Sequence, residues 1–120
     1  MPDDFSRAQR LGEQVKRELA LVIQRELRDP RLGMVTVNFV DLSKDLSHAS
    51  VNVTILTADD EETGIYEALT LLNRASSFLR TELGRVLKIR RLPYLRFFYD
   101  DSLKKSAQIN TLIHAVRRGN

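Results

Sequence analysis

The fold is decided by a stretch of alternating residues in the first half of the chain. Residues 34–57 read MVTVNFVDLSKDLSHASVNVTILT. Apolar and polar residues alternate on either side of a short polar turn, a pattern typical of an antiparallel hairpin with one buried face. We therefore expect strands at about 34–41 and 48–57. The residues expected to face the core are Val35, Val37, Phe39, Ala49, Val51, Val53 and Ile55.

Apolar residues recur every three or four positions before the hairpin, which predicts a helix over about 7–28. Ser6 followed by Gln9 is a capping-box signature and would mark the start of this helix. Asp29-Pro30 would end it, because the residue before a proline avoids the helical region.

A second helical pattern follows the hairpin and runs to about residue 89. The pattern is interrupted at Ala75-Ser76-Ser77, where we expect the helix to bend. Pro93 then stops the helix, and residues 95–99 form a short aromatic strand. The helices between the second and third strands form a crossover long enough to make those strands parallel. The sequence thus predicts an α+β fold with helices on one face of a three-stranded mixed sheet.

Composition sets the limits of the chemistry. The chain has 120 residues, which suits a single domain over 1–120 with a core of about 7–101 and a C-terminal helix within about 102–120. It contains no cysteine, which excludes disulfides, thiolate zinc sites and cysteine nucleophiles. No apolar run is long enough to span a membrane, and the acidic residues in MPDDFSRAQR do not fit a signal peptide, so we expect a cytoplasmic protein.

Charge is unevenly distributed along the chain. The formal net charge is only +3, but the segment 74–96 holds seven basic residues and one acid. The segment 59–67 holds five acids and no base, which complements the N-terminus of the helix that begins there. Such a pattern favours a polyanionic partner on one face of the molecule. The alternative is that these basic residues only solvate exposed helix faces.

Helical geometry groups the basic residues into faces. At about 100° per residue, one arc of the first helix carries five basic residues, Arg7, Arg10, Arg17, Arg25 and Arg28, of which the first three are the candidate phosphate contacts. Another arc, in the helix after Ser77, carries basic residues that could contact phosphates. Its members are Arg80, Arg85 and Lys88.

Catalytic signatures are weak. The histidines, His48 and His114, lack partners at the spacing of a metal site or a triad. Asp100 and Asp101 could hold Mg²⁺ in a nuclease, but adjacent strand residues point to opposite sides, so turn formation and helix capping are favoured. We expect no enzymatic activity, no cofactor, no metal and no small-molecule substrate.

Several motifs together resemble one family. They are Arg7-x-x-Arg10-Leu11, LRDPRL at 27–32, VDLSKDL at 40–46, VNV at 51–53 and PYLRFFYDDS at 93–102. This pattern is similar to bacterial ribosome-binding factor A over about four fifths of the chain.

The resemblance implies a type II KH-like fold in which a helix–kink–helix replaces the usual nucleic-acid loop. It also implies a non-enzymatic, cold-adaptation-associated assembly factor that binds the free small (30S) ribosomal subunit and assists late 16S rRNA maturation, including the 5′ end region. Ser77 stands where the family has glycine. The alternative is a general RNA- or DNA-binding KH-like module without a ribosomal role. We expect a monomer, with RNA contacts from Arg7, Arg10, Arg17, Arg74, Ser76, Ser77, Arg80, Arg85, Lys88, Arg90 and Arg91.

Overall fold

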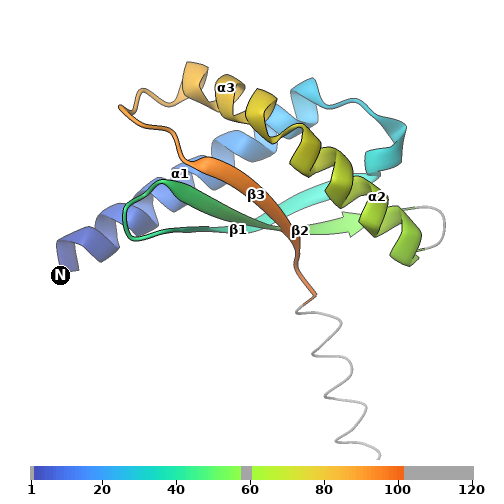
Figure 1. Cartoon of the computed structure of the whole chain (residues 1–120), viewed down its shortest axis with the longest axis horizontal. Coiled ribbons are helices and arrows are strands. Elements are labelled where there is room, and N and C mark those ends of the chain that lie inside the picture. The colour runs from blue at the N-terminus through green and yellow to red at the C-terminus, as the bar shows by residue number, and fades with distance from the viewer. Residues whose placement is uncertain (1, 58–60, 102–120) are drawn as a thin grey trace, which may run out of the picture.

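A computed structural model describes residues 2–57 and 61–101 of the chain (Figure 1). The expected C-terminal helix lies outside the described residues. The described residues form three helices, one short 3-10 turn and three strands. In chain order they are α1 (Pro2–Glu26), η1 (Pro30–Leu32), β1 (Met34–Leu42), β2 (His48–Leu56), α2 (Glu61–Arg74), α3 (Ser76–Val86) and β3 (Tyr94–Tyr99).

The three strands form one mixed sheet in the order β1-β2-β3. β1 pairs antiparallel with β2, and β3 pairs parallel with the other edge of β2. The three described helices lie on one side of this sheet, whose other face carries no described helix (Figure 1). The first three predicted helices and the mixed three-stranded sheet are therefore confirmed.

The core lies between the helices and the covered face of the sheet. Gly12 brings α1 close to β1, since a Cβ at this position would lie 3.0 Å from the Val40 carbonyl oxygen. The largest fully buried hydrophobic side chains come from α1, β2, α2 and α3. They are Val15, Leu19, Val22, Val51, Val53, Leu72, Leu79 and Leu83.

A β-bulge in β1 changes which residues face the core. The register shifts between Val37, opposite Val53, and Phe39, opposite Asn52. Asn38 is thus the extra residue, and its side-chain amide donates to Thr54 Oγ1 at 2.6 Å and to Asp100 Oδ2 at 2.7 Å. The expectation that Phe39 faces inward is wrong, because the bulge reverses the alternation and leaves its side chain 43% exposed.

Both ends of α1 differ from expectation. The helix begins at Pro2 rather than near residue 7, so Ser6 is an interior residue and not an N-cap. Proline is favourable in a first helical turn because it has no N–H to leave unpaired there. The helix ends at Glu26, and Asp29 instead caps η1 by accepting from the Arg31 N–H at 3.0 Å.

The expected break between α2 and α3 is confirmed at Ala75. Its ψ of 1° departs from the value near −42° of a regular α-helix. The break lets Leu72 and Leu79, one on each helix, both reach the core with no exposed surface. α3 ends three residues earlier than expected, because Leu87 is extended and leads the chain towards β3.

Candidate nucleic-acid interface

The helix break lies beside the exposed edge of the sheet. β3 is an edge strand, and Asn73 and Ser76 flank the break across from it. Together with residues of β2 and β3 they line a shallow groove. The strand residues of this groove are His48, Ala49, Ser50, Tyr94, Leu95, Arg96 and Phe98.

Asn73 ties the end of α2 to this edge. Its Oδ1 accepts from the Phe97 N–H at 2.8 Å, and its Nδ2 donates to the Phe97 carbonyl at 3.2 Å. One amide thus satisfies two main-chain groups that a neighbouring strand would otherwise bond. The distance between the helix break and β3 is therefore held by hydrogen bonds as well as by packing.

We expect Asn73→Ala to destabilise the fold by about 1–2 kcal/mol, because it removes both hydrogen bonds to the β3 edge. The melting temperature should fall by about 4–8 °C. Gln9→Ala, at an exposed position of α1, is the control and should melt like the parent. Equal melting of the two variants would show that the Asn73 amide does not stabilise the edge.

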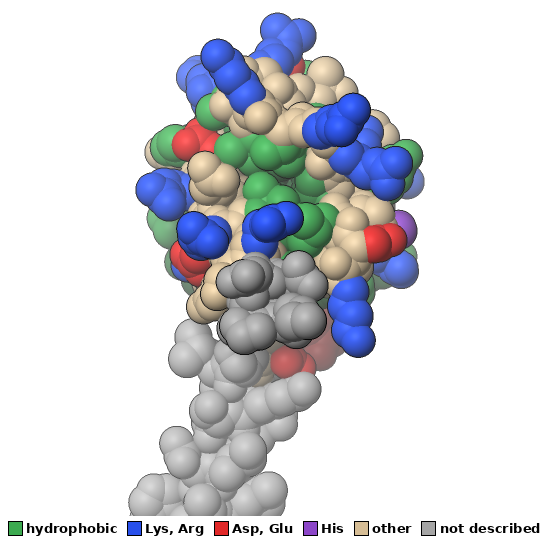
Figure 2. Space-filling view, turned by 90° about the vertical axis from the view of Figure 1, so that its left-hand side faces the viewer, with side chains coloured by type: hydrophobic (Ala, Val, Ile, Leu, Met, Phe, Trp, Pro, Cys, Tyr) green, Lys and Arg blue, Asp and Glu red, His purple; other side chains and the backbone are tan. Residues whose placement is uncertain are grey.

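Four arginines meet at one end of the molecule. Arg7 and Arg10 of α1, with Arg90 and Arg91 of the loop between α3 and β3, surround a hollow of about 520 Å³. We call these four residues the arginine-rich end; all four are exposed. Figure 2 looks onto this end and shows hydrophobic side chains in the middle with Lys and Arg side chains around them. The remaining lining residues are Leu11, Gln14, Asp45, Leu46 and Ile89.

α3 holds the loop that carries Arg90 and Arg91. The guanidinium of Arg80 donates to the carbonyl oxygens of Leu92 (2.8 Å from Nη2) and Pro93 (3.2 Å from Nε). A Cβ on Gly84, one turn further, would lie 2.5 Å from Leu92 Cδ1, so the glycine leaves room for the Leu92 side chain.

Arg80 therefore has partners that the sequence did not predict. Its Cζ also lies 4.3 Å from the centre of the Tyr94 ring, at cation–π distance. The side chain is partly buried and faces the loop, whereas the helical arc suggested that it faces solvent. Its Nε and Nη2 groups donate to main-chain carbonyls, so Arg80 holds the loop in position.

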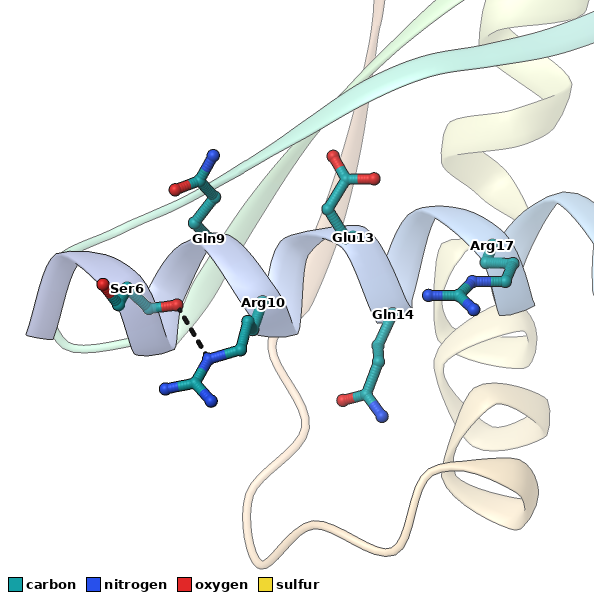
Figure 3. A pocket seen from close by; sticks show the side chains of 6 residues that line it. All are labelled: Ser6, Gln9, Arg10, Glu13, Gln14 and Arg17. Atoms are coloured by element: carbon teal, nitrogen blue, oxygen red, sulfur yellow. Dashed lines mark hydrogen bonds between the residues drawn. The ribbon is translucent and has the colours of Figure 1, made fainter. Parts of the chain in front are cut away.

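The other predicted site residues are spread over several surfaces. Arg17 lies on α1 beyond Arg10, and both line an exposed surface of this helix (Figure 3). In that view Arg10 and Gln14 point to the same side of α1. Arg85 Nε lies 3.4 Å from Glu82 Oε1, and the Arg85 side chain is 73% exposed. The remaining three, all exposed, are Arg74 at the end of α2, Ser77 at the start of α3 and Lys88 after its end.

The turn between β1 and β2 brings one acid to the arginine-rich end. Asp45 Oδ1 accepts from both hydroxyls that flank it, Ser47 Oγ and Ser43 Oγ, each at 2.7 Å, and from the Ser47 N–H at 3.1 Å. These bonds hold the pKa of the Asp45 carboxyl well below its usual range. The carboxylate therefore stays ionised at neutral pH and fixes the shape of the turn.

Acidic and histidine side chains do not gather into a metal site in the described part of the chain. Within residues 2–57 and 61–101, no three of them come together as ligands would. Asp100 accepts a hydrogen bond from Asn38, as described above. No helix among the same residues is long and apolar enough to cross a membrane.

Sequence reasoning missed several residues of the groove and the hollow. Arg96 and Tyr94 share the outer face of β3, and Arg96 Cζ lies 5.4 Å from the centre of the Phe98 ring. The alternation of β3 indicates this outer face, because Leu95 and Phe97, at the intervening positions of the strand, are buried. Nothing in the local sequence distinguishes Asn73 or Leu46, whose roles depend on contacts with distant segments.

A cluster of exposed basic residues on one face of a small domain, such as the arginine-rich end, is the electrostatic feature expected of a nucleic-acid-binding protein. Comparison with known proteins narrows this class. A family model described as ribosome-binding factor A matches residues 7–113. Ribosome-binding factor A of Stutzerimonas stutzeri is 49% identical over 113 residues, which is 94% of this chain and 88% of that protein. The chain belongs to the ribosome-binding factor A family.

Solved structures agree with this assignment. The crystal structure of ribosome-binding factor A from Thermus thermophilus is 43% identical, with a TM-score of 0.64 over 77% of this chain and 94% of that one. A homology model of the T. thermophilus factor, fitted into the cryo-EM map of a complex with 30S, is 41% identical. Its TM-score is 0.65 over 78% of this chain and 96% of that one.

Proposed function

We propose that this protein is an assembly factor that binds the free small ribosomal subunit and assists late maturation of 16S rRNA, including its 5′ end region. The observation that carries the proposal is the match to the T. thermophilus factor, which has been fitted into the map of a 30S complex. The arginine-rich end supports it, because exposed arginines are suited to bind RNA phosphates. A type II KH-like fold is part of the same proposal, as are a monomeric state, a cytoplasmic location and a link to cold adaptation.

The mechanism we propose is differential binding. A factor shifts the folding equilibrium of an RNA only by the difference between its affinities for the two RNA states. The protein would hold an immature rRNA arrangement through two surfaces, the arginine-rich end and the groove at the helix break. Arg17, Arg74, Ser76, Ser77, Arg85 and Lys88 would add contacts between and around them.

Sedimentation through a sucrose gradient tests the proposal. The full chain, mixed with free small subunits, large subunits or translating ribosomes, is expected to travel with free small subunits alone. Raising the salt concentration should release it, because phosphate contacts weaken as counterions compete. Equal binding to all three particles, with similar affinity for unrelated RNA, would favour a general RNA-binding module instead.

We expect the purified protein to leave precursor rRNA uncut in the presence of Mg²⁺. The expectation rests on the absence of cysteine, of a paired histidine and of a phosphate-binding loop from the sequence. The readout is the length of the rRNA ends after incubation, with Asp100→Ala as the matched variant. Cleavage by the parent that this variant loses would make the protein a nuclease.

A further inference from the structure

The turn at the arginine-rich end contains a residue in an unusual backbone conformation. Leu46 has a φ of 63° and is the only non-glycine residue with positive φ in the described segments 2–57 and 61–101. Glycine and asparagine are the residues that adopt this left-handed conformation readily, and a leucine there costs roughly 1–2 kcal/mol. The Leu46 N–H donates to the Ser43 carbonyl at 2.9 Å, so the turn itself fixes the conformation.

Packing in the core does not explain the leucine. Leu11 and Ile89, which share the hollow with it, pack against the buried core cluster. Leu46 is half-buried, and in the described part of the chain it is not among the side chains that pack against this cluster. Leu46 instead lines the hollow that the four arginines also line, on the end of the molecule whose middle is hydrophobic (Figure 2). A strained residue that the core does not require is a candidate for a role in binding.

We propose that the hollow binds an unpaired base of single-stranded RNA on the apolar floor formed by Leu11, Leu46 and Ile89. The four arginines would contact the phosphates on either side of that base. This inference rests on the proposed function and specifies how the protein binds RNA. The hollow would recognise an unstacked nucleotide, in addition to the charge of the RNA backbone. RNA is typically recognised in this way, through unstacked bases that leave the helix.

The chemistry of the rim suits this ligand. Guanidinium groups bond to phosphate oxygens in pairs and also stack on the flat face of a base. The ionised Asp45 on the turn side of the hollow repels a phosphate there but can accept from an N–H group of a base. The arrangement therefore places the base towards the turn and the phosphates towards α1 and the 87–93 loop. A strand of acidic peptide would place carboxylates over the same apolar floor, which is less favourable.

The experiment compares two RNA probes and two variants of the full chain. The probes are a fluorescent ten-nucleotide single-stranded RNA and the same strand made of abasic sites, which keeps every phosphate. The variants are Leu46→Gly, which relieves the strained backbone and removes the apolar side chain, and Leu46→Asn, which also tolerates the left-handed conformation. Leu56→Gly is the control, because it removes a leucine that is 67% exposed at the other end of β2.

The parent should bind the intact RNA about tenfold more tightly than the abasic strand, because burial of one base on apolar side chains and its stacking on a guanidinium contribute on this scale. Both Leu46 variants should lose most of that difference, while the salt dependence and the affinity for the abasic strand stay unchanged. Leu56→Gly should behave like the parent. The melting temperature of Leu46→Asn is expected to stay within a few degrees of that of the parent. If Leu46→Gly unfolds, the binding of Leu46→Asn alone tests the inference.

Several outcomes would overturn the inference. Equal affinity of the parent for both RNA probes would mean that the protein contacts only phosphates and that the hollow binds no base. Unchanged base discrimination in both Leu46 variants would place the base elsewhere. Tighter binding of a ten-residue poly-glutamate peptide, lost in the Leu46 variants, would assign the hollow to an acidic protein segment. None of these results changes the expected co-sedimentation of the parent protein with free small subunits. Failure of this inference is therefore distinct from failure of the proposed function.

Discussion

Replacing Arg7, Arg10, Arg90 and Arg91 together by glutamate is expected to weaken binding to free small subunits about 1,000-fold. Each of the four exposed guanidinium groups would lose a charge-assisted bond to a phosphate, and about 1 kcal/mol from each accounts for this factor. The slope of log affinity against log salt should fall by about three, because each phosphate contact contributes about 0.7–0.9. Affinities at four salt concentrations measure both quantities.

A pair of double variants provides the matched control. Arg90→Glu with Arg91→Glu changes the net charge by the same amount as Arg25→Glu with Arg28→Glu, which lie in the last turn of α1 and just after it. The first pair should weaken binding strongly and the second only slightly. Similar losses in both would mean that overall charge, and not the arginine-rich end, determines the affinity. Melting temperatures should change little, because exposed charges contribute little to folding.

Arg80→Ala is expected to destabilise the fold by about 2–3 kcal/mol and to lower the melting temperature by about 10 °C. The substitution removes the guanidinium bonds to the Leu92 and Pro93 carbonyls and the contact with the Tyr94 ring. Arg80→Lys should recover only part of this loss, since one ammonium group lacks the planar fork that reaches both carbonyls. Thermal melting and the position of the 87–93 loop, followed by NMR, are the measurements.

The expected effect on RNA binding separates two roles for Arg80. If Arg80 only positions the loop, Arg80→Ala weakens binding because the loop is misplaced, and Arg80→Lys recovers the same part of the binding as of the stability. If Arg80→Ala melts like the parent but loses affinity for small subunits, its guanidinium contacts the RNA directly, as the helical arc alone suggests. Arg85→Ala serves as the comparison, because that side chain is 73% exposed and bonded only across one helical turn.

Features with a strong local signal were predictable from the sequence. The hairpin follows from alternation over 34–57, and the break at Ala75 from an interrupted helical pattern. The parallel pairing of β3 follows from the length of the crossover. The hairpin and the break depend on residues close together in the chain, where periodicity determines which face is buried, and the parallel pairing depends only on the length of chain between two strands.

Features that depend on contacts between distant segments were not predictable in this way. The bulge at Asn38 inserts one residue into an otherwise regular alternation, and its partner Asp100 lies 62 positions away. The inward orientation of Arg80 depends on a loop that begins seven residues later, which an angular plot of one helix does not include. The arginine-rich end likewise brings the start of α1 next to the loop between α3 and β3. Helical periodicity treats these two segments separately and does not show that they meet.

The parallel pairing of β2 with β3 has a consequence for how the chain folds during synthesis. The hairpin of β1 and β2 is complete once residue 56 is made, but β3 begins only at residue 94. Until then the second edge of β2 has no strand partner, and closing the sheet must await the crossover of α2 and α3. An exposed strand edge attracts other chains, so this interval is when the nascent protein is most prone to aggregate. Asn73 is made before β3, and its amide therefore covers part of the new outer edge as soon as Phe97 arrives.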